Sequence, residues 1–252
     1  MFQFQRRKQH SVGELRFFET ELLSKRQNDQ VFSDELRTNV QPWAILRNEE
    51  LVPFEHLANW LGIPDEAKFI ISAEYDPGAD IILVLPSGSI GIQITSADAD
   101  WNGDGGRTQA LENFALGRNG IAWGAGGTYK RGSKGPLVSE PRAVDSIERQ
   151  RACRDGIGKA ISRKLVKLSV ADCLLVYARQ FSKELIDEGF VEFLRPIVLN
   201  TVERSSRNDG KYPVFVVDGA GSGQVAFGVN TERIVSQLSQ HCTLPAIFSI
   251  NT

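Results

Sequence analysis

Two oxygen-bearing side chains fall at matching ends of two β-rich segments. Asp80 begins the segment 80–85, and Gln93 lies near the end of the segment 90–95. The turn residues Pro86-Ser87-Gly88 between them predict a hairpin. Because the start of one hairpin strand lies beside the end of its partner, we expect Asp80 and Gln93 to meet at one rim of a sheet. A carboxylate, an amide oxygen and a backbone carbonyl there would suit Mg²⁺, which completes its shell with water and phosphate oxygens.

A basic region follows these two segments. Residues 103–167 hold 13 Lys or Arg and 6 Asp or Glu, a net charge of +7, although the whole chain carries −2. Part of this charge forms one face of a predicted helix at 145–168, opposite an apolar face. The cations of that face are Arg149, Lys159, Arg163 and Lys167. The region is a candidate anion-binding surface, and a solvated helix face beside a polar loop is the alternative interpretation.

The elements that must position these residues follow from periodicity and turn signals. Helical spacing predicts helices at 11–26, 33–46 with a break at Pro42, 53–61, 145–168, 184–202 and 231–241. Short β-rich runs predict strands at 68–73, 80–85, 90–95, 172–178, 213–218, 224–229 and 246–250. Three strands, a helix, a strand and then further β and α segments indicate an α/β fold. We expect a mixed central sheet flanked by helices.

The chain divides into three expected parts. Residues 1–50 form an N-terminal helical segment, which could serve as an arm of a homodimer. Residues 51–178 form a core that contains a Gly-rich insertion at 96–144, and a long insertion of this kind is usually functional. Residues 179–252 follow without a Pro/Gly/Ser linker, so we expect them to form a C-terminal α/β extension of the same sheet.

Composition excludes several classes of protein. The 252 residues are 41% hydrophobic and 24% charged, which is typical of globular chains and not of disordered, collagen-like or coiled-coil ones. The three cysteines are far apart, which argues against a disulfide framework and fits a reducing compartment. The basic start of the chain lacks the apolar stretch of a secretory signal, and no apolar run approaches the roughly 20 residues of a membrane helix. We expect a cytoplasmic protein with no membrane partner.

Other common chemistries lack their motifs. The three histidines are scattered and no Cys-x-x-Cys occurs, so a zinc site is not expected. The glycines at 219–223 follow a strand but precede another strand, whereas a phosphate loop needs a helix behind its glycines. No Gly-Lys-Ser/Thr and no Gly-x-Ser-x-Gly occurs.

The predicted order of helix, three strands, helix and strand resembles the PD-(D/E)XK nuclease superfamily, which has the restriction-endonuclease-like fold. In that family an aspartate opens the second strand and Glu/Asp-x-Lys ends the third. The matching residues here are Asp76-Pro77-Gly78-Ala79-Asp80 and Gln93-Ile94-Thr95. The stretch 90–97 (IGIQITSA) is also similar to bacterial members of unknown function that carry Glu/Gln-x-Thr. The resemblance covers about residues 53–178 and departs from the family in lacking its lysine.

The resemblance implies a Mg²⁺ site, with Mn²⁺ as an alternative ion. Asp80, Gln93 and the carbonyl of Ile94 would hold it. Further ligands would come from Glu74 or from an acid of the first helix, with Glu55 favoured over Glu35. Threonine cannot supply the positive charge of the family's lysine. The implied catalytic residues are therefore Asp80, Gln93 and Thr95, with Lys159 or Arg163 replacing the lysine.

The sequence is compatible with three functions. The first is metal-dependent hydrolysis of phosphodiester bonds in nucleic acid, DNA more than RNA. In this function, the backbone of the nucleic acid would be held by Lys130, Arg131, Lys134, Arg149 and Lys167. The second is a catalytically inactive nuclease-fold module that binds nucleic acid or a protein, which the missing lysine favours. The third is an unrelated α/β enzyme with a small phosphorylated substrate, which a closed cavity would indicate.

Overall fold

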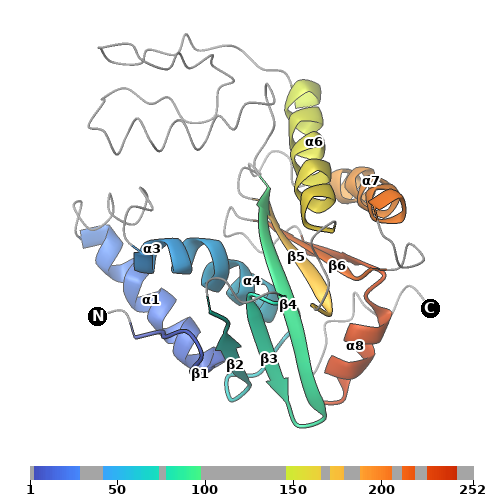
Figure 1. Ribbon diagram of the computed structural model, residues 1–252. Helices are drawn as coiled ribbons and strands as arrows, with labels where there is room; N and C mark the ends of the chain where they lie inside the picture. Colours follow the sequence, from blue (N-terminus) through green and yellow to red (C-terminus); the bar gives the residue numbers. More distant parts are fainter. Residues whose placement is uncertain are drawn as a thin grey trace.

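The chain folds around one mixed sheet of seven strands with helices on both faces, as predicted (Figure 1). The computed structural model describes residues 3–28, 42–73, 78–97, 146–165, 171–178, 188–205, 212–218 and 226–242. No helix in these ranges is both long enough and apolar enough to cross a membrane.

The strands follow one another across the sheet in the order of the sequence, from β1 to β7. They are β1 (Gln9–Ser11), β2 (Lys68–Ile71), β3 (Ile81–Leu85), β4 (Gly88–Ala97), β5 (Cys173–Ala178), β6 (Val214–Asp218) and β7 (Ala226–Val229). The first four are antiparallel. The pairs β4–β5 and β5–β6 are parallel, and β7 is again antiparallel. Parallel neighbours need crossover connections, and α6 (Ser146–Leu165) and α7 (Glu188–Ser205) occupy those two positions.

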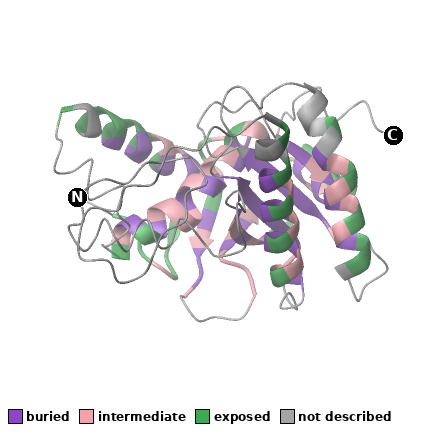
Figure 2. Ribbon diagram, turned by 90° about the horizontal axis from the view of Figure 1, so that it is seen from above, coloured by how far each residue is buried: buried purple, intermediate pink, exposed green. Residues whose placement is uncertain are grey.

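Helices from the two ends of the chain cover one face of the sheet. They are α1 (Val12–Asn28), α4 (Val52–Trp60) and α8 (Glu232–Ser239), with the short α3 (Pro42–Leu46) and the π-helical turn η1 (Arg47–Leu51) leading into α4. The helices α6 and α7 cover the other face. Figure 2 shows buried residues along the sheet and exposed ones on the outer sides of the helices.

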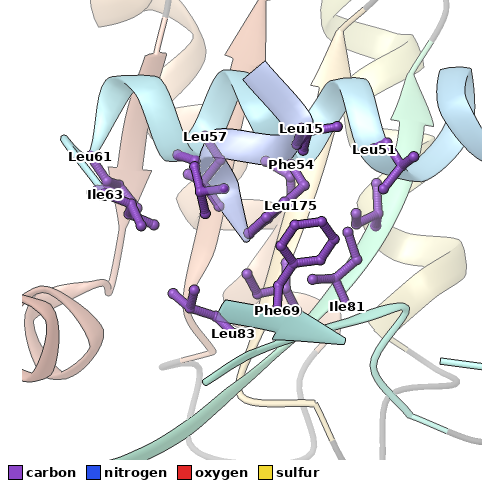
Figure 3. Packing of buried hydrophobic residues seen from close by; sticks show 14 of the residues in the cluster. Leu15, Leu51, Phe54, Leu57, Leu61, Ile63, Phe69, Ile81, Leu83 and Leu175 are labelled. Carbon is purple, nitrogen blue, oxygen red and sulfur yellow. The ribbon is translucent and has the colours of Figure 1, made fainter. Parts of the chain in front are cut away.

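Each face has its own apolar core. On the α4 face, Phe54 and Leu57 pack over Phe69 and Leu175, all of them almost completely buried (Figure 3). Full burial of one such side chain is worth about 1.5–3 kcal/mol, so this cluster fixes α4 firmly on the sheet. On the α6 face, side chains that include Ile157 and Ile161 belong to the second core, and α6 packs against β4 and β5.

Strand β5 lies at the centre of both cores. All six of its residues are buried, which confirms the prediction of a fully buried strand. Leu175 and Tyr177 point to the α4 face, whereas Leu174 and Val176 point to the α6 face. This alternation is what a strand covered on both sides requires.

Some boundaries differ from those expected. Strand β4 runs from Gly88 to Ala97, and its last five residues lie beyond Ile92, which pairs with Ile81 at the start of β3. Near Pro42 the structure begins a short helix, α3, at the proline, as the missing N–H of proline favours. The first part of the predicted helix 33–46, residues 98–144 of the predicted insertion 96–144 and the predicted strand 246–250 lie outside the described residues, and residues 96–97 belong to β4. Strand β1 was not expected, because its three residues show no alternation.

A buried ion pair ties η1 to α1. The Nε of Arg47 donates to Oε1 of Glu19 at 2.8 Å, and its Nη2 donates to Oε2 of the same carboxylate. Only 15% of the Arg47 side chain and 6% of the Glu19 side chain are exposed. Because η1 continues directly into α4, this pair fixes the start of that helix relative to α1.

We predict that Arg47→Met will destabilise the chain by about 3–5 kcal/mol, because it leaves the Glu19 carboxylate buried without its partner. Urea unfolding measures this loss. The double variant Glu19→Gln/Arg47→Met removes both charges and is expected to be clearly more stable than the single variant. Equal stability of the two variants would show that the pair does not anchor η1.

Candidate functional site

The candidate site lies where β3 begins and β4 continues past it. Strand β3 pairs with β4 only from Ile81, opposite Ile92, to Leu85. Beyond Ile92, β4 keeps its pairing with β5 on its other side as far as Ala97. Among the described residues, no strand pairs with the β3-facing edge of β4 over its last five residues, and Asp80 stands at the start of this edge.

The Asp80 carboxylate accepts a backbone hydrogen bond from β4 beyond the point where β3 stops pairing with it. Its Oδ2 accepts a hydrogen bond from the backbone N–H of Ile94 at 2.6 Å and another from Nε2 of Gln93. Its own backbone stays in the sheet: its N–H donates to the carbonyl of Ile92 and its carbonyl accepts from Ser72, both at 2.9 Å. Asp80 and Gln93 are thus neighbours at the rim, as the hairpin predicted.

The Ile94 carbonyl faces the same edge. In a strand, the N–H and C=O of one residue point to the same neighbouring strand. Since the N–H of Ile94 points to Asp80, its carbonyl lies along the unpaired edge as well. The sheet therefore brings together a carboxylate, a carboxamide and a backbone carbonyl.

Burial and nearby cations act on the Asp80 carboxyl in opposite directions. Its partial burial raises the pKa above the ordinary value, and this effect prevails. The hydrogen bond from Ile94 and the positive charges of Lys164 and Arg6 lower the pKa. The cations come from two elements far apart in sequence, the end of α6 and the segment before β1.

Lys164 is the cation of α6 whose charge reaches Asp80. Its side chain is partly buried, whereas Lys159 and Arg163 are exposed on the outside of the helix. Arg163 donates through Nε to the carbonyl of Lys159 at 3.3 Å, within its own helix. The structure thus turns Lys164 toward the sheet with residues 160, 161 and 165, whereas the two cations that the sequence favoured lie on the exposed side of α6.

Arg6 links the N-terminal segment to the site. Its Nη1 donates to the carbonyl of Ser72 at 2.7 Å, and its two terminal nitrogens donate to the Glu50 carboxylate at 3.1 and 2.6 Å. Ser72 is the backbone partner of Asp80. Arg6 therefore holds the end of β2 and η1 beside the rim.

The first-helix acid expected at the site lies elsewhere. Glu55 is on α4 facing α1, and the charges acting on it are Glu19, Arg47 and Arg16. The acids of η1 come closer to the rim: Ser96 of β4 donates to Oε2 of Glu49 at 3.1 Å. Ser96 lies on the α4 side of β4, opposite the side that Gln93 occupies, so Glu49 approaches from the other face of the sheet.

The remaining predicted residues have simple placements. Thr95 lies two residues after Gln93 on β4, on the same side of the strand and partly exposed. Arg149 belongs to α6, but its side chain is outside the described part of the structure. Glu35, Glu74, Lys130, Arg131, Lys134 and Lys167 all fall outside the described residues.

The oxygen atoms at the rim are of the type that hard divalent cations prefer, but they are few. Within the described ranges, no three His, Cys, Asp or Glu side chains gather as a metal group. The donors on hand are Asp80, the Ile94 carbonyl and Gln93, whose amide oxygen and nitrogen exchange places by a half-turn of the side chain. Mg²⁺ is often held by one or two carboxylates, with water and substrate phosphate supplying the other ligands. The set fits such an ion.

A scan against models of protein families, a search of curated proteins and a search of solved structures found no match to this chain.

Sequence reasoning missed Lys164, Arg6 and Glu50. Lys164 is adjacent to a residue it did consider, and the signal that could have identified it is its place next to the apolar stripe of α6. Arg6 and Glu50 had no such signal. Their roles depend on β1 and η1 bringing distant segments to the end of β2.

The ionisation of the Glu55 carboxyl makes the free energy of unfolding depend on pH. Burial, with the negative charge of Glu19, raises its pKa from 4.5 to about 7. Below pH 4.5 the Glu55 carboxyl is protonated in both the folded and the unfolded chain, so it does not lower the free energy of unfolding. Between these values the unfolded chain loses its proton first, and stability falls as pH rises. Above pH 7 the cost reaches about 3 kcal/mol at 1.36 kcal/mol per pKa unit.

We predict that Glu55→Gln will be more stable than the parent chain at pH 8 and about equal to it at pH 4. The gain should be at most about 3 kcal/mol, since glutamine needs no ionisation and keeps a partner for Asn59. Urea unfolding across this pH range measures the difference. A constant difference between the two chains at all pH values would contradict the assignment.

We predict that Lys164→Gln will raise the pKa of Asp80 further, because it removes a positive charge that favours the carboxylate. Titration of the Asp80 carboxyl carbon by NMR measures the shift. Arg163→Gln is the matched control, since it removes the same charge one residue away on the exposed side. Equal shifts in the two variants would mean that Lys164 has no specific proximity to Asp80.

Proposed function

We propose that this chain is a metal-dependent nuclease-like protein that hydrolyses phosphodiester bonds at the rim formed by Asp80 and Gln93. The observation that carries the proposal is the meeting of these two side chains and the Ile94 backbone at the unpaired edge of β4. The order from α4 through β2, β3, β4 and α6 to β5 is the order of elements in the family that the sequence resembles. This agreement supports the proposal.

The donor atoms at the rim suit Mg²⁺, or Mn²⁺ in its place. Asp80, the Ile94 carbonyl and the Gln93 amide oxygen would hold it. When bound, such an ion supplies a more acidic water and neutralises charge on the phosphate. Asp80 provides the one full negative charge of the set, and its ionised form is the one that binds a cation. Gln93 offers a neutral oxygen and so makes binding weaker than the family's acid would.

Lys164 supplies the positive charge that Thr95 cannot. Its position on the inner side of α6 brings an ammonium group into the electrostatic reach of Asp80. In the proposed reaction this charge stabilises the additional negative charge that develops on the phosphate. The same charge lowers the pKa of Asp80 and keeps more of it in the form that holds a cation.

One observation favours a second function, a nuclease-fold module that binds nucleic acid or a protein without cleaving. Oδ2 of Asp80 already accepts two hydrogen bonds, one of them from the Ile94 backbone. This is also what a residue would do if its only role were to terminate β3 and satisfy the N–H of Ile94. The two functions differ in whether the rim binds a divalent cation.

We predict that Asp80→Asn will bind Mg²⁺ and Mn²⁺ far more weakly than the parent chain and will lose metal-dependent cleavage of mixed DNA and RNA by about 10²–10³-fold. Calorimetric titration and a cleavage assay measure the two effects. Asparagine keeps an oxygen that can accept from the Ile94 N–H, so the fold is expected to persist, as circular dichroism would show.

Asp65→Asn is the matched control. It removes one carboxylate that is exposed and paired with Arg16, away from the rim. It should bind metal and cleave like the parent chain. Metal binding in neither parent nor variant would favour the binding module. Cleavage that survives Asp80→Asn would refute the assignment of this rim.

A further inference from the structure

The segment that precedes β1 is folded against the end of β2. Its Phe4 side chain is 3% exposed and stacks on Phe69 of β2, with the two ring centroids 6.3 Å apart. Three residues later, the backbone N–H of Arg7 donates to the carbonyl of Ile71 at 2.7 Å. The segment is therefore held to β2 on both sides of Arg6, and the Arg6 side chain starts from a fixed position.

The backbone of this segment is strained at Arg7. Its φ is 63°, in the left-handed region that residues other than glycine adopt rarely. Backbone of this kind persists only where the surrounding contacts hold it, and it is found preferentially at functional sites. Here two successive residues of the segment bind two successive carbonyls of β2 and its end. Arg7 binds that of Ile71 through its backbone, and Arg6 binds that of Ser72 through its guanidinium.

A chain of hydrogen bonds leads from Arg6 to the rim. Nη1 of Arg6 donates to the carbonyl of Ser72 at 2.7 Å, and the N–H of Ser72 donates to the carbonyl of Asp80 at 2.9 Å. The Asp80 carboxylate in turn accepts the N–H of Ile94 at 2.6 Å. The same guanidinium binds both oxygens of Glu50, at 3.1 and 2.6 Å. Because a guanidinium is planar and holds several partners in one fixed geometry, it fixes the Ser72 backbone relative to η1.

We propose that Arg6 is a positioning residue of the rim, which holds the backbone of Asp80 so that its carboxylate keeps its place beside Ile94. The inference rests on the proposed function and adds a residue of the N-terminal segment to the site. A misplacement of about 1 Å at a reacting centre costs up to about 10²-fold in rate, so a residue that never touches the substrate can control the reaction. Arg6 acts through the geometry of its two partners, which a lysine does not reproduce.

The test compares Arg6→Gln and Arg6→Lys with the matched control Arg16→Gln. The Arg16 side chain is 28% exposed, like that of Arg6, and it also binds one carboxylate and one backbone carbonyl. These belong to Asp65 and, at 2.8 Å, to Ile63, both of which precede β2 and so lie at the opposite end of that strand from the rim. Circular dichroism and urea unfolding establish that the variants are folded and how far each is destabilised.

The first readout is amide hydrogen exchange at Ile94 in EDTA, which reports its hydrogen bond to Asp80 without any metal. Arg6→Gln should exchange there about tenfold faster than the parent chain, and Arg16→Gln should exchange as the parent does. The second readout is Mg²⁺-dependent cleavage of mixed DNA and RNA. Arg6→Gln should lower kcat by about 10–100-fold and leave KM nearly unchanged. Arg6→Lys should restore only part of either property.

Three results would overturn the inference: equal exchange at Ile94 in Arg6→Gln and Arg16→Gln, full restoration by Arg6→Lys, or a loss of cleavage in Arg6→Gln with unchanged exchange at Ile94. All three leave the proposed function intact, because cleavage and its dependence on Asp80 are measured separately. Conversely, faster exchange at Ile94 in Arg6→Gln, in a parent chain that cleaves nothing, would support the anchoring of Asp80 by Arg6 and refute the nuclease.

Discussion

The position of the Asp80 carboxylate depends on the point at which β3 stops pairing with β4. Strand β4 is held in place beyond that point by β5, and among the described residues no strand pairs with the backbone groups of its other edge. Asp80 supplies a partner by accepting the N–H of Ile94. Because an unpaired buried N–H costs about 1–3 kcal/mol, the sheet itself fixes the carboxylate. In the proposed function, a carboxylate fixed for this reason would be a preorganised ligand beside Gln93.

Elements from the whole chain converge on this rim. Arg6 connects the end of β2 to Glu50 of η1, and η1 is in turn held to α1 by the pair of Arg47 with Glu19. From the other face, the last turn of α6 brings Lys164 within electrostatic reach of Asp80. The packed cores therefore position charges, and a change in the placement of η1 or α6 would alter the pKa of Asp80.

Most of the architecture could be predicted because its signals are local. The hairpin that brings Asp80 to Gln93 follows from alternation and a turn, and the burial of β5 follows from an unbroken apolar run. The choice among cations of α6 could not be made by helical spacing alone. Lys164 and Arg163 differ by one residue, and the packing of the helix decides which of them faces the sheet. The contact of Arg6 depends on a three-residue strand that has no pattern of its own.

The most direct test of a metal site at this rim is to locate a bound cation. Mn²⁺ is paramagnetic and broadens the NMR signals of nuclei near it, so a titration at substoichiometric Mn²⁺ identifies the residues that surround the ion. If the rim holds the ion, the backbone amide of Ile94 and the side-chain amide of Gln93 broaden selectively, and Asp80→Asn loses this effect. Broadening centred on other residues, or unchanged by Asp80→Asn, would contradict the claim that this rim holds a metal.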